Sequence, residues 1–244
     1  MEYTIIRLAE TDSTNKQLKE LWLAGRAGEG TAVLAERQTA GRGRLGRDFF
    51  SPEGGLYFSL LLRPRDLAAD AGLITVSASV ALARACDRFL PEGAAPTKIK
   101  WVNDLYRDGR KIAGILAEAV SRGSESRVIL GVGVNLTLPE GGFPAELREK
   151  AGALFTALAP EERENLRLSL FEAFLGEFEA LCGAPDCLPE YRARMFLTGR
   201  PVNYEKDGRT HEATVTGVGE RGELLLREDG REITLSCGEV SVRV

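Results

Sequence analysis

The sequence is poor in residues that bind transition metals, since its 244 residues include one histidine, His211, and four cysteines. The cysteines, Cys86, Cys182, Cys187 and Cys237, are scattered and show no zinc-site spacing, so we expect reduced, mostly buried thiols. A long apolar run is also missing: no stretch approaches the roughly 20 residues that cross a bilayer, and the N-terminal residues do not form a signal-peptide pattern. These absences predict a cytoplasmic protein with no membrane segment.

Neither sign of charge is in large excess. Thirty-two Lys and Arg residues against 36 Asp and Glu give a net charge of −4, which does not favour binding to nucleic acid or to an anionic membrane. Any anion site must therefore be formed locally. Hydrophobic residues make up 43% of the chain, enough for a sizeable core, and the length suggests one large domain with a small appendage.

The first part of the chain alternates short β-branched or apolar runs with helical patterns. Strands are expected at 31–36, 56–63, 97–101, 111–120 and 127–136, the last two as an antiparallel pair. Helices are expected at about 14–24, 70–90, 161–181 and 186–195. The first opens on a capping-box pattern, Thr14-Asn15-Lys16-Gln17, and closes at Gly25. This order predicts an α+β fold, a mixed β-sheet covered by helices.

After Phe196 the sequence pattern changes. Apolar and polar residues alternate at 202–205, 212–218, 223–227 and 232–235, and glycine-containing turns separate these runs. This pattern predicts a small β-barrel of hairpins. We therefore divide the chain into a core domain at 1–196 and a C-terminal domain at 197–244.

Residues 41–47, Gly-Arg-Gly-Arg-Leu-Gly-Arg, form a cationic, glycine-rich loop after a predicted strand. Arginine offers planar pairs of donors to phosphate or carboxylate, and glycine lets backbone N–H groups approach an anion. A dinucleotide fingerprint is rejected because Pro52 and the two glycines after it forbid a long helix, and a P-loop fails because Arg47 and Asp48 stand where Lys and Ser or Thr belong. A solvated basic loop or a nucleic-acid contact stays open.

Two further patterns place polar residues or glycines in apolar strands. Within residues 98–105, a predicted strand begins with Lys98 and Lys100 and is followed by the polar pair Asn103-Asp104. This pattern also fits an edge strand followed by a turn. Residues 131–136 carry two glycines within a strand, which suggests close approach of a ligand or a bulge.

Taken together, residues 13–15, 38, 41–47, 100–105, 111–114 and 131–135 resemble the motifs of biotin–protein ligases in order and approximate spacing, over nearly the whole chain. The resemblance implies a catalytic domain followed by an SH3-like β-barrel. It also implies that ATP and biotin form biotinyl-5′-AMP, and that biotin passes to a lysine of a biotin carboxyl carrier protein of the acetyl-CoA carboxylase type. The family suggests a homodimer. Because the first helix follows the N-terminus almost at once, without room for the helix-turn-helix domain of bifunctional members, we expect no DNA binding.

The resemblance also implies residue roles. Biotin binding falls to Ser13, Thr14, Asn15, Gln38, Arg42, Gly43, Arg44, Lys111, Gly114 and Gly133. Nucleotide binding falls to Arg42, Arg44, Arg47, Phe49, Asn103 and Asn135, and Asp104 is the candidate ligand of Mg²⁺. Arg42, Arg44 and Lys111 are the expected catalytic cations. Ser13 or Thr14 could instead only cap the helix.

Two residues depart from the family pattern: Val102 replaces a common proline, and Phe49 stands where tryptophan is frequent. We expect activity to survive and the arginine loop to close over the adenylate, excluding water. The alternatives are a lipoate–protein ligase, which shares the fold, a nucleic-acid-binding protein, and a binding module without activity.

Overall fold

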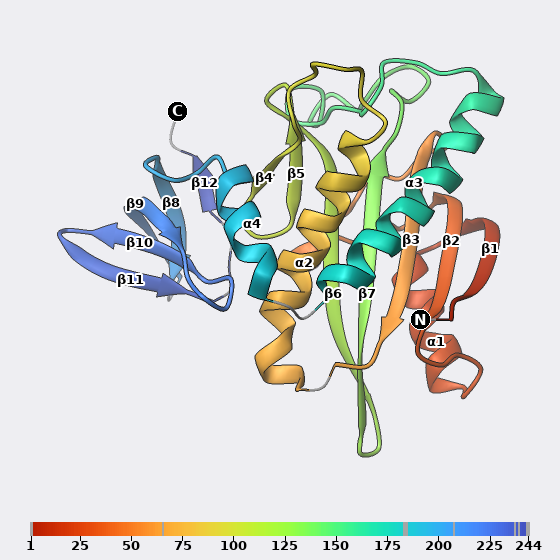
Figure 1. Cartoon of the computed structure of the whole chain (residues 1–244), viewed down its shortest axis with the longest axis horizontal. Helices are drawn as coiled ribbons and strands as arrows, with labels where there is room; N and C mark the ends of the chain where they lie inside the picture. Colours follow the sequence, from red (N-terminus) through yellow and green to blue (C-terminus); the bar gives the residue numbers. More distant parts are fainter. Residues whose placement is uncertain are drawn as a thin grey trace.

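A seven-stranded mixed sheet organises the larger part of the chain (Figure 1). The computed structural model describes residues 2–64, 66–182, 185–206, 208–236, 238 and 240–242. The strand order is β1-β2-β3-β7-β6-β5-β4, with β1 parallel to β2 and the other neighbours antiparallel. The strands are β1 (Thr4–Thr11), β2 (Thr31–Gln38), β3 (Gly55–Leu62), β4 (Lys98–Lys100), β5 (Asp104–Arg107), β6 (Arg110–Arg122) and β7 (Glu125–Asn135).

Helices cover the two faces of this sheet differently. Helices α2 (Leu67–Asp87) and α3 (Pro160–Leu181) pack on one face, where Phe58 of β3 lies 4.9 Å from Phe171, centroid to centroid. Helix α1 (Thr14–Leu23) lies on the other face and buries Trp22 against Ile129 and its neighbours, as a separate core cluster. Because side chains alternate along a strand, each strand supplies both faces. The face that bears α1 is only partly covered by it.

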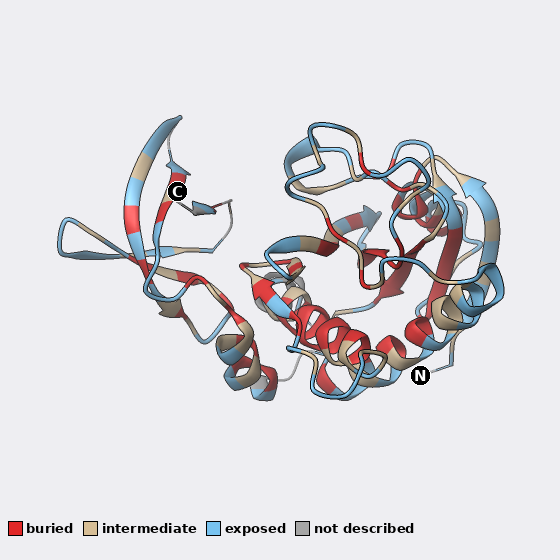
Figure 2. Ribbon diagram, turned by 90° about the horizontal axis from the view of Figure 1, so that it is seen from above, coloured by how far each residue is buried: buried red, intermediate tan, exposed pale blue. Residues whose placement is uncertain are grey.

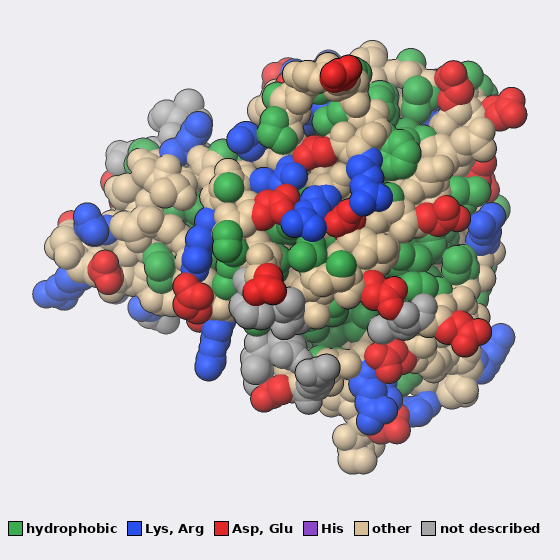
Figure 3. Space-filling view, viewed as in Figure 1, with side chains coloured by type: hydrophobic (Ala, Val, Ile, Leu, Met, Phe, Trp, Pro, Cys, Tyr) green, Lys and Arg blue, Asp and Glu red, His purple; other side chains and the backbone are tan. Residues whose placement is uncertain are grey.

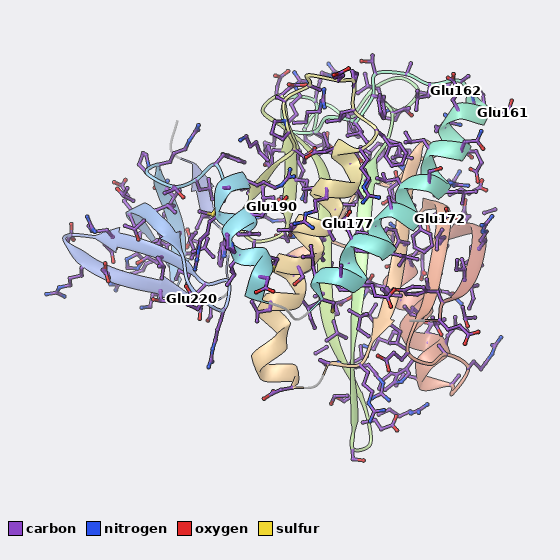
Figure 4. All side chains as sticks on the ribbon, viewed as in Figure 1. Glu161, Glu162, Glu172, Glu177, Glu190 and Glu220 are labelled. Atoms are coloured by element: carbon purple, nitrogen blue, oxygen red, sulfur yellow. The ribbon has the colours of Figure 1, made fainter. Side chains whose placement is uncertain are left out.

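The helix layer is joined by ion pairs. Arg84 of α2 donates to Glu190 of α4 (Leu188–Arg194) at 2.8 Å and to Glu177 of α3 at 3.1 Å. Figure 4 labels both glutamates, on the two helices that flank α2, and Figure 3 shows acidic and basic side chains interspersed over this surface. The pairs fix the three helices side by side above the sheet.

The chain after α4 forms a second, five-stranded antiparallel sheet beside the first (Figures 1 and 2). Its strands are β8 (Pro201–Lys206), β9 (Arg209–Val218), β10 (Leu224–Glu228), β11 (Arg231–Leu235) and β12 (Val240–Val242), in the order β11-β10-β9-β8-β12. The sheet is antiparallel throughout. No strand pairing among the described residues joins β11 to β12, so a closed barrel is not shown. The indole Nε1 of Trp101 donates to the Gly222 carbonyl at 2.8 Å and ties the two sheets together.

Most expected elements are confirmed within a few residues, with three additions. Strands β1, β5 and β12 were not predicted, because they are short or lie at sheet edges where a half-exposed face weakens the apolar alternation. Of the readings left open for residues 98–105, the edge strand agrees with the topology, since β4 is the outermost strand. Among the described residues, none of the helices is both long and apolar enough to span a bilayer.

Two predictions on individual residues are corrected or qualified. The expected capping box on α1 is wrong: the N-cap is Ser13, whose side chain makes no cap bond within the described chain, and Thr14 bonds elsewhere. The thiols of Cys86 and Cys187 are buried, whereas Cys182 is exposed. Burial raises the pKa of the Cys86 thiol to about 12, so this thiol stays protonated. Cys237 lies outside the described residues.

Candidate active site

A cavity of about 110 Å³, partly open to solvent, lies on the α1 face of the large sheet. Six segments converge on it: the start of α1, the end of β2, the loop after β2, the start of β5, the first half of β6 and the middle of β7. Its described lining consists of Ser13, Thr14, Asn15, Gln38, Arg42, Gly43, Arg44, Arg47, Asp48, Phe49, Asn103, Asp104, Lys111, Gly114, Ile115, Leu116, Gly131, Val132 and Gly133. The cavity is therefore lined by polar groups, cations and glycines.

Glycines form the floor of the cavity. Gly114 of β6 and Gly133 of β7 are direct partners across the two strands. The ring of Phe49 lies on both glycines. A Cβ added to Gly114 would stand 3.2 Å from the nearest ring atom, and one added to Gly133 would stand 2.6 Å from it. A Cβ at Gly133 would therefore displace the ring, whereas a Cβ at Gly114 would require a shift of only a few tenths of an ångström. We expected a ligand against these glycines, and in this structure Phe49 covers them.

One end of the cavity is a hydrogen-bonded group of uncharged side chains. The Gln38 Oε1 accepts from the Thr14 backbone N–H at 2.9 Å and from the Thr14 hydroxyl at 3.1 Å. The Gln38 amide nitrogen then donates to Ser51 Oγ at 2.9 Å, and Ser51 donates to the Phe49 carbonyl at 2.8 Å. A backbone N–H can only donate, so it fixes which way the Gln38 amide points. The start of α1 is thereby joined to the arginine loop.

Two cations of the lining are held by neighbouring side chains. The Arg44 guanidinium donates to Asn103 Oδ1 at 3.1 Å and to the Gly238 carbonyl of the C-terminal region at 2.9 Å. Lys111 Nζ lies 2.6 Å from Asp104 Oδ1 and 5.7 Å from the centroid of Phe49. Asn103 is held in turn, because its Nδ2 donates to the Ile115 carbonyl at 2.7 Å. Each of these two cations is therefore held by a neighbouring side chain of the lining, Arg44 by Asn103 and Lys111 by Asp104.

The loop itself has a defined turn. The Phe49 N–H donates to the Gly41 carbonyl at 2.8 Å and the Gly43 N–H donates to the Arg47 carbonyl at 2.7 Å. A Cβ at Gly41 would stand 2.4 Å from the Phe49 carbonyl oxygen, so only glycine fits there. The glycines of the loop let its two backbone segments approach each other closely, and they also give the loop conformational freedom.

All but one of the residues singled out from the sequence line this cavity. Asn135 is outside the described lining, and its Nδ2 donates to the Gly152 carbonyl at 2.9 Å in a buried position. In this structure Asn135 supports the chain after β7, and its predicted nucleotide role stays a prediction. Lining residues to which the sequence analysis assigned no role are Asp48, Ile115, Leu116 and Val132, and Gly131 was included only in the glycine pattern of its strand. For Gly131 the signal was present, because it shares a strand face with Gly133.

The carboxylates do not form a metal site by themselves. Asp48 and Asp104 line the cavity, and the described residues include no group of three His, Cys, Asp or Glu side chains that could hold a metal ion. Mg²⁺ commonly binds through one or two carboxylates together with substrate phosphates. The residues therefore suit a metal that arrives with a nucleotide and do not suit one held by protein alone.

Residues 8–135 match the model of the biotin/lipoate A/B protein ligase family. The chain belongs to this family. Residues 197–243 also match the biotin protein ligase C terminal domain. Thus the biotin/lipoate ligase motifs recognised in the sequence, from Ser13 to Asn135, fall on the walls of the cavity or next to it.

Two curated relatives of this ligase family are similar over most of the chain. The biotin–(acetyl-CoA-carboxylase) ligase of Mycobacterium tuberculosis is 31% identical over 96% of this chain and 86% of its own length. The ligase of the same name from Paracoccus denitrificans is 32% identical over 96% and 98%. Among solved structures, a biotin protein ligase from Aquifex aeolicus in complex with biotin and ATP aligns with a TM-score of 0.75, 28% identity and 98% coverage of both chains.

Proposed function

We propose that the chain is an ATP-dependent biotin–protein ligase and that the cavity is its active site. The observation that carries the proposal is a single cavity lined both by the hydrogen-bonded uncharged groups of Thr14 and Gln38 and by the cations Arg44 and Lys111. Biotin has the matching polarity, with a ureido group at one end and a carboxylate at the other. The relatives and the Aquifex complex, named for the same reaction or ligands, support this reading.

In the first half-reaction a biotin carboxylate oxygen attacks the α-phosphorus of ATP, and the bond to pyrophosphate breaks, which gives biotinyl-5′-AMP. The two anionic reactants repel each other, and Arg42, Arg44 and Lys111 offset this repulsion as fixed cations. In this reading Arg47, Phe49 and Asn103 contact the nucleotide. Asp104, which is paired with Lys111 at 2.6 Å, would hold Mg²⁺ together with the phosphates of ATP, and the ion would supply charge shielding there.

In the second half-reaction the ε-amine of a carrier lysine attacks the acyl carbon, AMP leaves, and an amide forms. The carrier we propose is the biotin carboxyl carrier protein of acetyl-CoA carboxylase, in line with the names of the relatives. The adenylate is a mixed anhydride that water hydrolyses, so we propose that loop 41–49 closes over it. Biotin should then slow proteolysis within this loop, and equal cleavage with and without biotin would contradict closure.

The organisation of the chain is part of the proposal. Residues 1–196 act as the catalytic domain and residues 197–244 as an SH3-like barrel that reaches the active site through the contact of Arg44 with Gly238. The net charge of −4 favours activity without binding to DNA or membrane. We place the protein in the cytoplasm, where ATP is available, and expect a homodimer, to be measured by sedimentation with and without biotin.

The deciding experiment measures ATP-dependent pyrophosphate release by the purified protein with biotin or with lipoate, and then mass gain on the lysine of a carrier domain. We expect release with biotin and one biotinyl group on the carrier. Lipoate is the serious competitor because the matching family includes lipoate ligases. A preference for lipoate would assign the cavity to that substrate, and absence of release with both acids would contradict ligase activity.

A further inference from the structure

The side-chain amide of Asn15 is held from both ends beside the cavity. Its Nδ2 donates to the Glu118 carboxylate at 2.6 Å, and its Oδ1 accepts from the Ser59 hydroxyl at 2.5 Å. Asn15 and Ser59 are almost fully buried, so neither bond is exchanged freely with water. An amide has two N–H groups and an oxygen with two lone pairs. After these two bonds, Asn15 keeps one donor and one acceptor.

The carboxylate decides which way this amide points. An ionised carboxylate accepts hydrogen bonds and cannot donate one. If the Asn15 amide were flipped, its oxygen would face Glu118 Oε2 at the 2.6 Å now spanned by a hydrogen bond, and two acceptors would repel. The Ser59 hydroxyl can rotate to donate or accept, so it does not set this choice. Glu118 is thus the residue that sets the orientation of the Asn15 amide, because its carboxylate can only accept a hydrogen bond.

The fold brings these residues together from three separate parts of the chain. Glu118 lies on β6, two alternations beyond Gly114 and on the same face of the sheet. Asn15 reaches it across Gly131 of β7, where a Cβ would stand 2.1 Å from Asn15 Oδ1. Asn15 lines the cavity, whereas Glu118 is outside its described lining. Glu118 can therefore act on a ligand through Asn15.

We infer that Glu118 is a positioning residue for substrate recognition, which fixes the Asn15 amide so that its remaining N–H and carbonyl oxygen meet a cyclic urea. A cyclic urea places an N–H donor beside a carbonyl acceptor, the complement of the free pair on Asn15. A rotated amide would present its donor and acceptor in reversed order. This inference rests on the proposed function, and it identifies Glu118 as the residue that sets the selectivity of the cavity for the ureido ring.

The test compares Glu118→Ala with the unchanged protein by steady-state pyrophosphate release and by calorimetric titration with biotin. We expect KM and Kd for biotin to rise about 10-fold, because a charge-assisted hydrogen bond of this kind is lost. KM for ATP and kcat should change less than about twofold, since Arg42, Arg44 and Lys111 are untouched. Glu118→Gln should fall in between, because its amide can accept but can also rotate. An unchanged biotin Kd in Glu118→Ala would overturn the inference.

A double-mutant cycle separates positioning from a general structural effect. In an Asn15→Ala background, the change Glu118→Ala should raise the biotin Kd by less than about twofold, since the group that it orients is gone. Equal factors in both backgrounds would show that Glu118 acts independently of Asn15 and would overturn the inference. Glu172→Ala is the matched control, because Glu172 is exposed on α3, on the opposite face of the sheet (Figure 4).

The outcomes for the inference and for the proposed function are distinguishable. If the unchanged protein neither binds biotin nor releases pyrophosphate with it, the proposed function fails. If it does both and Glu118→Ala behaves identically, the ligase assignment stands and only the role of Glu118 is refuted. Melting curves of each variant ensure that an observed loss of binding belongs to a folded protein.

Discussion

The two faces of the β6–β7 pair show how one pair of strands serves two purposes. On the helix face, Ala113, Leu130 and Val134 are fully buried beneath α2 and α3, in the main apolar core. On the α1 face, the same strands present Gly114, Gly131 and Gly133 to the cavity. Since side chains alternate along a strand, of two residues next to each other in sequence one packs in the core and the other faces the cavity. Stability is assigned to one face and ligand space to the other, and the following variants test that division.

The largest effect on stability should come from Leu130→Ala. Leu130 is fully buried in the main core, so truncation should lower the free energy of unfolding by about 2–5 kcal/mol. Urea unfolding measures this loss, and the biotin Kd of the folded variant should stay unchanged. Leu23→Ala, at the exposed end of α1, is the control, expected within about 0.5 kcal/mol. A large rise in Kd for Leu130→Ala would break the division between the faces.

Lys111→Ala should produce the largest kinetic effect with little effect on stability. Removing a fixed cation from the site should slow adenylate formation by roughly 10²–10³-fold, which is the loss expected for one group that stabilises developing charge. Single-turnover pyrophosphate release measures it. Lys98→Ala, on the exposed outer strand β4, removes the same charge away from the cavity and should react at the normal rate. A normal rate in Lys111→Ala would remove this lysine from the mechanism.

Gly131→Ala sharpens the comparison by changing the immediate neighbour of Leu130. Its Cβ would stand 2.1 Å from Asn15 Oδ1, so we expect KM for biotin to rise about 10-fold while the main core is kept. Gly176→Ala is the matched control on α3, where a Cβ meets no described atom within 4 Å. That variant should bind biotin normally and gain about 0.5–1 kcal/mol of stability, because alanine is favoured over glycine in a helix.

The smallest effect concerns the ion pairs of the helix layer. Burial tends to raise the pKa of the Glu190 carboxyl, but hydrogen bonds from Arg84 and Arg194 outweigh burial and hold it below the ordinary value. A lowered folded-state pKa stabilises the fold above the unfolded-state pKa, and this contribution is lost as pH falls through the folded-state value. Glu190→Gln should therefore cost about 1 kcal/mol at neutral pH and progressively less as the pH falls below 4.5, the ordinary pKa of a glutamate carboxyl.

Thermal melts of both proteins across this pH range check that prediction. The difference in Tm between the unchanged protein and Glu190→Gln should shrink as the solution becomes acidic. A difference that is constant with pH would show that the carboxylate charge does not matter at this position. Pyrophosphate release with biotin should be equal in both proteins, because Glu190 lies in the helix layer, away from the described lining of the cavity.

Local patterns in the sequence were enough for much of the fold and for most of the cavity. Alternation and turn residues predicted β2, β3, β6, β7 and the hairpins of the C-terminal sheet, while the glycine–arginine loop and the Lys111 motif indicated an anion site. Strand β1 escaped prediction because its alternation is weak at a half-exposed edge. The expected capping box also failed, because the Thr14 hydroxyl forms a tertiary bond to Gln38 in place of a local one.

The sequence by itself determined which residues carry charge, which positions allow close backbone approach, and which strand face each residue takes, because these depend on local chemistry and on the period of a strand. Only the tertiary structure decided which of them meet. It set Asn135 aside from the cavity, placed Phe49 on the glycine floor, and joined Asn15 to Glu118 across 103 positions of sequence. Such contacts depend on strand order and register, which no local pattern specifies.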